Sequence, residues 1–210
     1  MTTTHPSIYL VGAGGHAKVI ADILIESGRP PVAFLDEAPK HNSVLGISVI
    51  RGLEIPEPNA AVILAIGDNF LREKIAARFT AFAVAIHPSA RVSRHAEIGP
   101  GTVVMAGAVI NAGACVGSHC VINTLASVDH DCLINDFAHV APGAILGGNV
   151  RVGAGSMIGL GANVVHGRVI GAHSVVGAGS TVVRDIPDNV VAFGVPARVV
   201  RPRASGDRYL

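Results

Sequence analysis

An uninterrupted six-residue repeat fills the second half of the chain. Starting at Ile86, every sixth residue up to Val182 is aliphatic, and no step of the series fails. The residue two positions earlier is small at nearly every step, with Val150 and Arg168 as exceptions. Two inward positions that lie two residues apart make a short strand, and the remaining residues make a corner. The repeat therefore predicts a parallel β-solenoid.

The first half has a different pattern, in which short apolar strands alternate with segments of helical spacing. Strands are expected at 7–12, 31–35 and 60–66, and helices at 17–27 and 69–78. Gly28 and Pro30 break the first helix. An order of strand, glycine turn, helix and strand favours a parallel sheet in a small Rossmann-like α/β domain.

The carboxyl edge of that sheet is the expected nucleotide site. Glycine lets a backbone approach a ligand closely, a helix N-terminus favours phosphate oxygens, and a carboxylate at a strand end can accept hydrogen bonds from a ribose or a base. The candidates are Gly12, Gly14, Gly15, His16, Asp36, Glu37 and Gly67. Alanine stands where the third glycine of a dinucleotide motif would be, so a whole dinucleotide is not expected. A purely structural tight turn is the alternative.

The composition argues against several classes of partner. The 210 residues have a formal charge of +1 and contain no basic block, so neither nucleic acid nor an anionic membrane is expected to bind. No apolar run reaches the ~18 residues of a membrane span, and no secretory signal is evident, so we expect a cytoplasmic protein. The cysteines Cys115, Cys120 and Cys132 lack disulfide or zinc spacing and are expected in the core. The tail from Pro202 to Leu210 is expected to be disordered.

The repeat resembles the left-handed β-helix of the hexapeptide-repeat acyltransferases, in which three six-residue units make one triangular coil. On that geometry the repeat fills between five and six coils, and residues 18 apart stack at the same corner. His130 lies in a corner, with Gly148 beside it in the next coil and His166 one coil further. His139 points outward from a strand on the far side of the triangle. The two histidines cannot meet within one chain, so a site using both must lie between neighbouring solenoids, as in a trimer.

Several segments resemble the sialic acid and bacillosamine type of sugar acyltransferase, the NeuD/PglD family. They are the GAGGHAKVI start, the FLDE strand end, INT at 122–124, VDHDC at 128–132, DFAHVAPGA at 136–144, LGGNV at 146–150 and the closing FGVPA. That family joins an N-terminal nucleotide-sugar domain to an acetyl-CoA-dependent solenoid, forms homotrimers and uses no metal. The resemblance implies a nucleotide-sugar domain over 1–84, an acyltransferase domain over 85–185 and a C-terminal segment over 186–210.

The resemblance also implies catalytic roles. His130 would be the general base that removes a proton as a sugar amine attacks the thioester, and the amide of Gly148 would hold the developing oxyanion. Asn123 would position the acceptor. Asp131 is the expected acid partner of His130. Asp129 is the alternative, because the family's bacillosamine enzymes carry His-Glu-Cys where this chain has a shorter acid on each side of the histidine.

Binding roles follow from the same resemblance. His139 of a neighbouring chain would contact acetyl-CoA, which would run past Leu160, Gly161 and Ala178. The nucleotide sugar would be held by Gly14, Gly15, His16, Asp36, Glu37 and Gly67. His166 would line the cofactor groove or have no role, and His95, His119 and His173 are expected to be solvated.

The expected activity is acetyl transfer to the 4-amino group of a UDP- or GDP-linked 4-amino-4,6-dideoxy sugar. One alternative is O-acetylation of a sugar or sialic acid, and another is a non-catalytic trimeric scaffold that binds a nucleotide sugar. A zinc solenoid of the carbonic-anhydrase kind needs three suitably spaced histidines, including a close pair. The chain has no His-x4-His pair, which disfavours that alternative.

Overall fold

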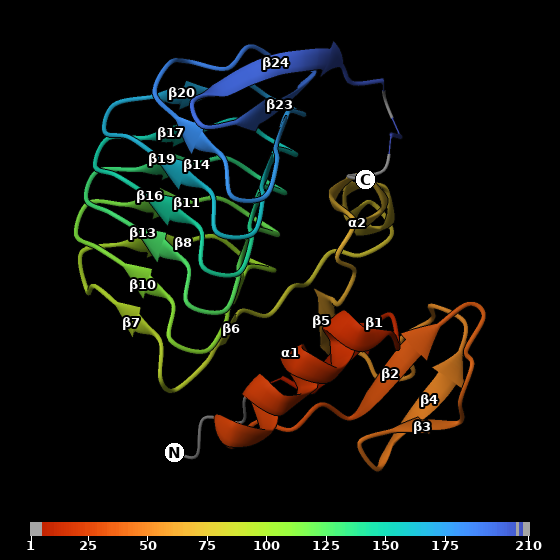
Figure 1. Cartoon of the computed structure of the whole chain (residues 1–210). Coiled ribbons are helices and arrows are strands. Elements are labelled where there is room, and N and C mark those ends of the chain that lie inside the picture. The colour runs from red at the N-terminus through yellow and green to blue at the C-terminus, as the bar shows by residue number, and fades with distance from the viewer. Residues whose placement is uncertain (1–5, 205, 208–210) are drawn as a thin grey trace.

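The computed structural model describes residues 6–204, 206 and 207, which form an α/β unit followed by a solenoid (Figure 1). The α/β unit contains β1 (Ile8–Val11), β2 (Ala33–Asp36), β3 (Ser43–Val44), β4 (Ile47–Arg51) and β5 (Ala61–Leu64). They form one sheet in the order β3-β4-β2-β1-β5, with β1 parallel to β2 and β5. The predicted parallel sheet is confirmed.

Two helices accompany this sheet, α1 (Gly15–Glu26) and α2 (Asn69–Ala76). The apolar face of α1 is buried at Ala17, Ile20, Ala21, Ile23 and Leu24, as its helical spacing predicts. Asp68 caps α2, because its side chain accepts a hydrogen bond of 2.8 Å from the Leu71 amide. Neither described helix is long and apolar enough to cross a membrane.

Strands β3 and β4 have no counterpart among the expected elements. They form an antiparallel pair at one edge of the sheet. In β4, Ile47 and Val49 pack against the apolar cluster of α1, but Ile50 is exposed, so the alternation of apolar and polar residues that marks a half-buried strand stops after three residues.

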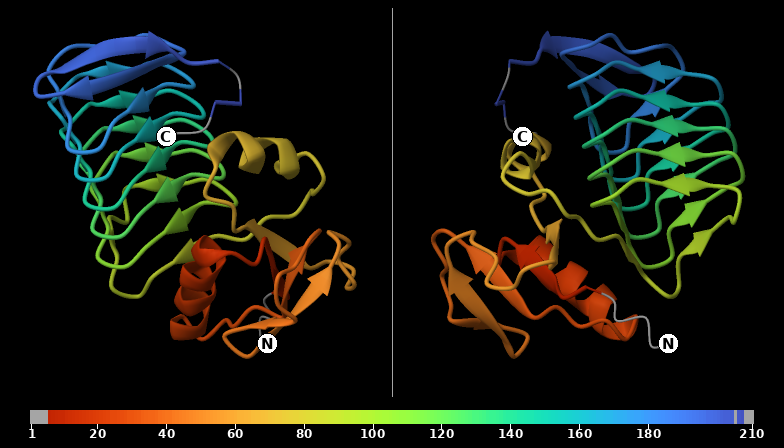
Figure 2. Two further views of the ribbon diagram at one scale, coloured as in Figure 1. Left: turned by 45° about the vertical axis from the view of Figure 1, so that its right-hand side comes forward. Right: turned by 180° about the vertical axis from the view of Figure 1, so that it is seen from behind.

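The solenoid consists of 17 two-residue strands arranged in three parallel sheets (Figures 1 and 2). The first sheet holds β6 (Ala85–Ile86), β9 (Val103–Val104), β12 (Val121–Ile122), β15 (His139–Val140), β18 (Met157–Ile158) and β21 (Val175–Val176). The second holds β7 (Arg91–Val92), β10 (Val109–Ile110), β13 (Ser127–Val128), β16 (Ile145–Leu146), β19 (Asn163–Val164) and β22 (Thr181–Val182). The third holds β8 (Glu97–Ile98), β11 (Cys115–Val116), β14 (Leu133–Ile134), β17 (Arg151–Val152) and β20 (Val169–Ile170).

The register of these strands follows directly from the repeat. Val109 pairs with Arg91 and with Ser127, so stacked residues are 18 apart, and the coil count is the predicted one. From Val104 to Val182 the aliphatic positions, with the alanines and cysteines two residues before them, form one buried cluster inside the triangle, while Ile86 in the first coil is exposed. Cys120 and Cys132 belong to this core, but Cys115 is only half-buried on the outside of β11, so the expectation was wrong for that residue.

The outer face of the first sheet is covered by the α/β unit. Val103 and Val121 point out of the solenoid and pack into the same apolar cluster as α1. His139 occupies the next position in this outward row, paired with Val121. The covering domain is the reason that an outward-facing histidine is buried.

A hairpin closes the last coil. It consists of β23 (Val190–Gly194), which pairs with β21, and β24 (Ala197–Pro202). The described residues that follow it lead back toward α2 (Figure 2). Arg203 is buried there and donates hydrogen bonds from its amide to the Asn189 carbonyl and from Nη1 to the His173 carbonyl. The disorder expected from Pro202 onward is therefore wrong for the described residues 202–204, 206 and 207, while residues 205 and 208–210 lie outside the described part of the chain.

Candidate active site

A cavity of about 280 Å³ lies at the carboxyl ends of β1, β2 and β5. Its lining includes the predicted residues Gly12, Asp36 and Glu37. The Asp36 carboxylate accepts hydrogen bonds from the amides of Ala13 and Ala38, at 3.0 and 2.9 Å, which fixes it beside the glycine turn. This is the position where a sheet of this type binds ligands.

The other predicted nucleotide-site residues lie around this edge. Gly14 and Gly15 are exposed at the start of α1. No atom lies within 4 Å of the position that a Cβ atom would occupy at either residue. His16 and Gly67 face the solenoid instead, where the rings of His16 and His139 have centroids 6.3 Å apart. His16 and Gly67 thus lie beside His139 of the same chain.

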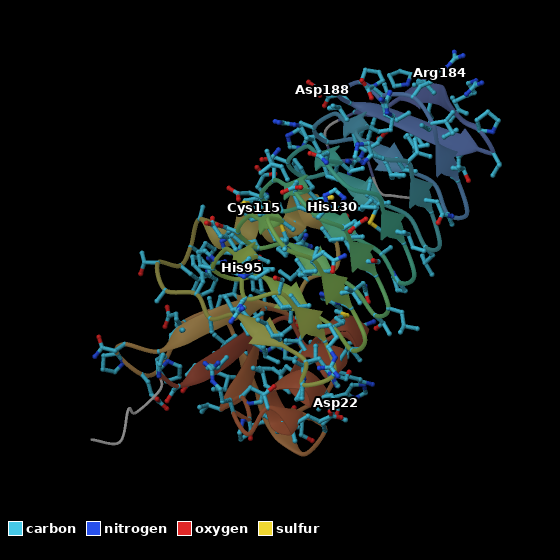
Figure 3. The ribbon with its side chains drawn as sticks, turned by 90° about the vertical axis from the view of Figure 1, so that its left-hand side faces the viewer. Asp22, His95, Cys115, His130, Arg184 and Asp188 are labelled. Atoms are coloured by element: carbon cyan, nitrogen blue, oxygen red, sulfur yellow. The ribbon has the colours of Figure 1, made fainter. Side chains whose placement is uncertain are left out.

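His130 lies at the corner between β13 and β14 (Figure 3). Its ring pairs with the Asp131 carboxylate. The His130 Nδ1 and Asp131 Oδ2 atoms are 2.8 Å apart, and both side chains remain half-exposed. This hydrogen bond is the main reason that the pKa of His130 is raised, and burial opposes it slightly. Of the two flanking acids, the structure pairs Asp131 with the ring.

Gly148 packs against the His130 ring from the next coil. A Cβ atom at Gly148 would overlap Nε2 and Cε1 of His130, so only glycine leaves room for this ring position. Within the described residues, the Gly148 amide donates no backbone hydrogen bond. His166 follows in the same column, with its ring centroid 6.2 Å from that of His130.

Asn123 lies with His139 rather than with His130. Asn123 Oδ1 accepts a hydrogen bond from the Thr124 amide, which turns Nδ2 toward His139 Nε2 at 2.9 Å. Nε2 therefore accepts, and the ring proton is assigned to Nδ1. Asn123, which the family resemblance implies would position the acceptor, therefore lies at a different corner of the chain from His130.

The surroundings of His16 and His139 keep both rings neutral. His139 is only 7% exposed, and burial, followed by the charges of Arg72 and His16, lowers its pKa to about 3. Burial and then Arg72 lower the pKa of His16 to about 4. At neutral pH both rings are uncharged groups that can donate and accept hydrogen bonds.

Three of the predicted cofactor residues, Leu160, Gly161 and Ala178, share the corner that follows the first sheet. Leu160 and Gly161 come after β18, and Ala178 comes after β21 one coil later. The Gly179 amide bonds to the Leu160 carbonyl, which places the two segments side by side. All three predicted residues are exposed, and Asn123 lies at the same corner two coils earlier.

The candidate residues therefore form two half-sites in one chain. The first contains His130, Asp131 and Gly148, at the corner between the second and third sheets. The second contains the remaining predicted residues of the solenoid and lies on or beside the first sheet, which is the opposite side of the triangle. Neither half is complete, so a site that uses both requires two chains.

Arg72 lies beside His16 and His139 and is not among the residues predicted from the sequence. It is only 1% exposed and donates hydrogen bonds to the carbonyls of Ile66, Gly67, His119 and Phe137. The first two carbonyls belong to the segment that follows β5, and the other two belong to solenoid corners, so Arg72 fixes the two domains to each other. A possible signal was the Asp68 cap, which puts Asn69 and Arg72 on one face of α2.

Two neighbours of Arg72 extend this contact. Asn69 Nδ2 donates to the carbonyls of Gly155 and Ser156, at 3.3 and 3.0 Å. His119, expected to be solvated, is buried between Phe82 and Phe137, with ring centroids at 4.3 and 4.8 Å.

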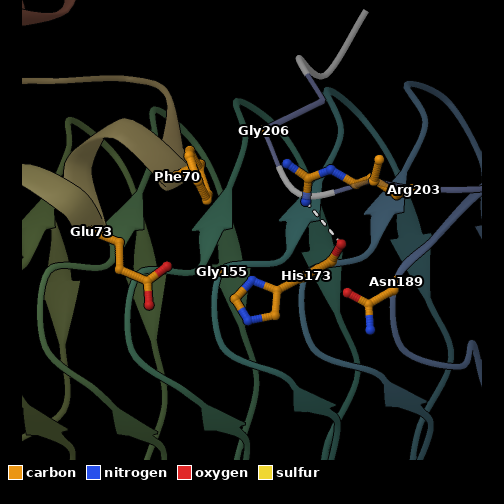
Figure 4. A pocket seen from close by; sticks show the side chains of 8 residues that line it. Phe70, Glu73, Gly155, His173, Asn189, Arg203 and Gly206 are labelled. Atoms are coloured by element: carbon orange, nitrogen blue, oxygen red, sulfur yellow. Dashed lines mark hydrogen bonds between the residues drawn. The ribbon is translucent and has the colours of Figure 1, made fainter.

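A smaller cavity of about 110 Å³ lies between α2, the solenoid corners and the C-terminal segment (Figure 4). Phe70, Glu73, His173, Asn189 and Arg203 line it, and none of them was a predicted site residue. In the described residues, no group of three or more His, Cys, Asp or Glu side chains is arranged to hold a metal ion.

Comparisons with known proteins agree with this architecture. Residues 7–79 match the family described as the PglD N-terminal domain. A match of 42% identity to the UDP-N-acetylbacillosamine N-acetyltransferase of Bacillus subtilis covers 48% of this chain and 51% of that enzyme, so the chain aligns with about half the length of this curated relative.

Two solved structures match over nearly their full length. One is a mutant of perosamine N-acetyltransferase from Caulobacter crescentus in complex with CoA and GDP-perosamine, with a TM-score of 0.89 and 40% identity over 93% of this chain and 97% of that one. The other is the acetyltransferase domain of PglB from Neisseria gonorrhoeae in complex with acetyl coenzyme A, with a TM-score of 0.87 and 39% identity over 94% of this chain and 100% of that one. The chain therefore belongs to the NeuD/PglD-type family of left-handed β-helix sugar acyltransferases.

Proposed function

We propose that this protein transfers the acetyl group of acetyl-CoA to the 4-amino group of a UDP- or GDP-linked 4-amino-4,6-dideoxy sugar. The observation that carries the proposal is the His130–Asp131 pair packed against Gly148, in a chain that shares its fold with a CoA- and GDP-perosamine-bound N-acetyltransferase. The cavity at Asp36 supports a nucleotide site on the α/β unit.

His130 acts as the general base in this proposal. The sugar amine attacks the thioester carbonyl, a carbon–nitrogen bond forms, and His130 Nε2 takes the proton that the amine loses. The Gly148 amide donates to the oxyanion that develops on the carbonyl oxygen. When the carbon–sulfur bond breaks, the thiolate of CoA leaves and receives a proton from His130. Asp131 holds the ring at Nδ1, so that Nε2 faces the substrate.

The complete site lies between two copies of the chain. His130 comes from one copy, while His139, Asn123 and the strip of Leu160, Gly161 and Ala178 come from its neighbour. The separation of the two half-sites within one chain supports this arrangement. A closed ring of three copies repeats the contact three times and leaves no half-site unmatched.

The test is release of free thiol from acetyl-CoA with a panel of UDP-, GDP- and dTDP-linked sugars, each with an amino group or a hydroxyl group at the same position. We expect release with one amino sugar, and that result also identifies the nucleotide. Release with hydroxyl sugars alone would replace the proposal by O-acetylation. Binding of a nucleotide sugar without release from any acceptor would favour a scaffold.

A further inference from the structure

Two carboxylates flank His130 in the chain, yet only Asp131 reaches the ring. Asp129 and Asp131 are both one residue away and have the same side-chain length, so sequence distance does not explain the choice. The explanation lies one coil earlier, in the corner formed by residues 111–113.

Asn111 holds Asp129 away from the ring. Asn111 Nδ2 donates to Asp129 Oδ1 at 2.8 Å, and the same oxygen accepts a hydrogen bond of 2.7 Å from the His130 amide. These bonds lower the pKa of Asp129, with the Asn111 bond as the largest cause. The Asp129 carboxylate is therefore ionised and hydrogen-bonded to Asn111 in the preceding coil.

Gly113 leaves room for Asp131. Both residues have left-handed backbone conformations, with φ of +75° and +58°, and they stack at the same corner position. A Cβ atom at Gly113 would overlap Asp131 Oδ1. Asp131 Oδ2 thus bonds to His130, while Asp131 Oδ1 occupies the space beside Gly113 where a side chain would otherwise be.

We propose that Gly113 is a positioning residue for the catalytic pair, because its missing side chain provides the space in which the Asp131 carboxylate reaches His130. Asn111, two residues earlier, completes the arrangement by fixing the competing acid. This inference deepens the proposed function, since it rests on His130 as the base, but the geometry is testable without turnover.

The titration of His130 reports this geometry. The groups that face the ring are Asp131, Asp129 and His166. The hydrogen bond to Asp131 stabilises the protonated ring and raises its pKa. Displacing the Asp131 carboxylate removes that stabilisation, so the pKa of His130 falls, and the low-pH limb of kcat/KM moves to lower pH.

The experiment is an NMR titration of the His130 ring in the full chain without substrate, with the signal assigned from its loss in His130→Ala. Gly113→Ala should lower the pKa of His130 toward the value in Asp131→Asn. Gly167→Ala is the matched control. Gly167 occupies the same corner column with φ of +69° but has no atom within 4 Å of a Cβ position, so the same backbone strain should leave the pKa of His130 unchanged.

Gly113→Asn is the second variant, because asparagine tolerates the left-handed region and Asn149 occupies it in the same column. A wild-type His130 pKa in either folded Gly113 variant would overturn the inference. Thiol release is measured separately on the same proteins. A lowered His130 pKa in a protein without acetyltransferase activity would contradict the proposed function while supporting the role of Gly113.

Discussion

His130→Ala should lower the kcat for acetyl transfer by about 10²–10⁴-fold, the usual contribution of a positioned general base. His130 is half-exposed and its ring packs on a glycine, so the substitution leaves no large cavity in the core. The thermal midpoint should therefore stay near that of the wild type. Thiol release and thermal unfolding, measured on the same preparation, check both parts.

His95→Ala is the matched control, because His95 is also an exposed solenoid histidine and pairs with no acid in the described structure. Its activity should be that of the wild type. A His130→Ala protein with full activity would remove His130 from the mechanism.

Asp131→Asn should lower the plateau rate and shift the low-pH limb of kcat/KM to lower pH, because the neutral His130 ring is the active form and its pKa falls without the carboxylate.

Arg72→Ala should lower the free energy of unfolding by about 3 kcal/mol or more. It leaves several carbonyl groups without a hydrogen-bond donor, and each such group costs about 1–3 kcal/mol when it is buried. The affected carbonyls join the end of β5 to the corners of the solenoid. For a chain of this size the thermal midpoint should fall by roughly 6–12 °C. Nucleotide-sugar affinity should fall as well, since the Gly67 segment loses its anchor.

Arg78→Ala provides the comparison for Arg72. Arg78 makes an exposed ion pair of 2.7 Å with Glu37, and exposed pairs contribute about 0–1 kcal/mol. Its midpoint should change little. Equal small effects of the two substitutions would show that the α/β unit and the solenoid do not depend on the Arg72 contacts.

The solenoid was predictable because its signal is redundant. Each coil must place aliphatic side chains such as Ile122 and Val140 inside the triangle, so the same constraint recurs in every unit. The position of His130 beside Gly148 follows from the 18-residue spacing of stacked corners, and the structure shows the two residues in contact. The choice between Asp129 and Asp131 did not follow, because it depends on Asn111 and Gly113, 18 residues away from them.

The contacts between the two domains could not be predicted from local patterns. Arg72 lies on a short helix whose polar residues resemble an ordinary solvated face, and only the docked solenoid makes it buried. His119 and His139 occupy repeat positions that usually face solvent, and the α/β unit covers them. The tail at Arg203 has no repeat at all, and it is ordered by hydrogen bonds to His173 and Asn189.

Sharing of each site between two chains is tested by mixing two variants, each of which lacks one half-site. His130→Ala and His139→Ala protomers are unfolded together in equal amounts, refolded, and assayed for thiol release. Each carries one intact half-site, so random assembly should restore complete sites at about one quarter of the interfaces and about one quarter of wild-type activity. Mixtures as inactive as either variant alone, from assemblies shown to contain both chains, would contradict the claim.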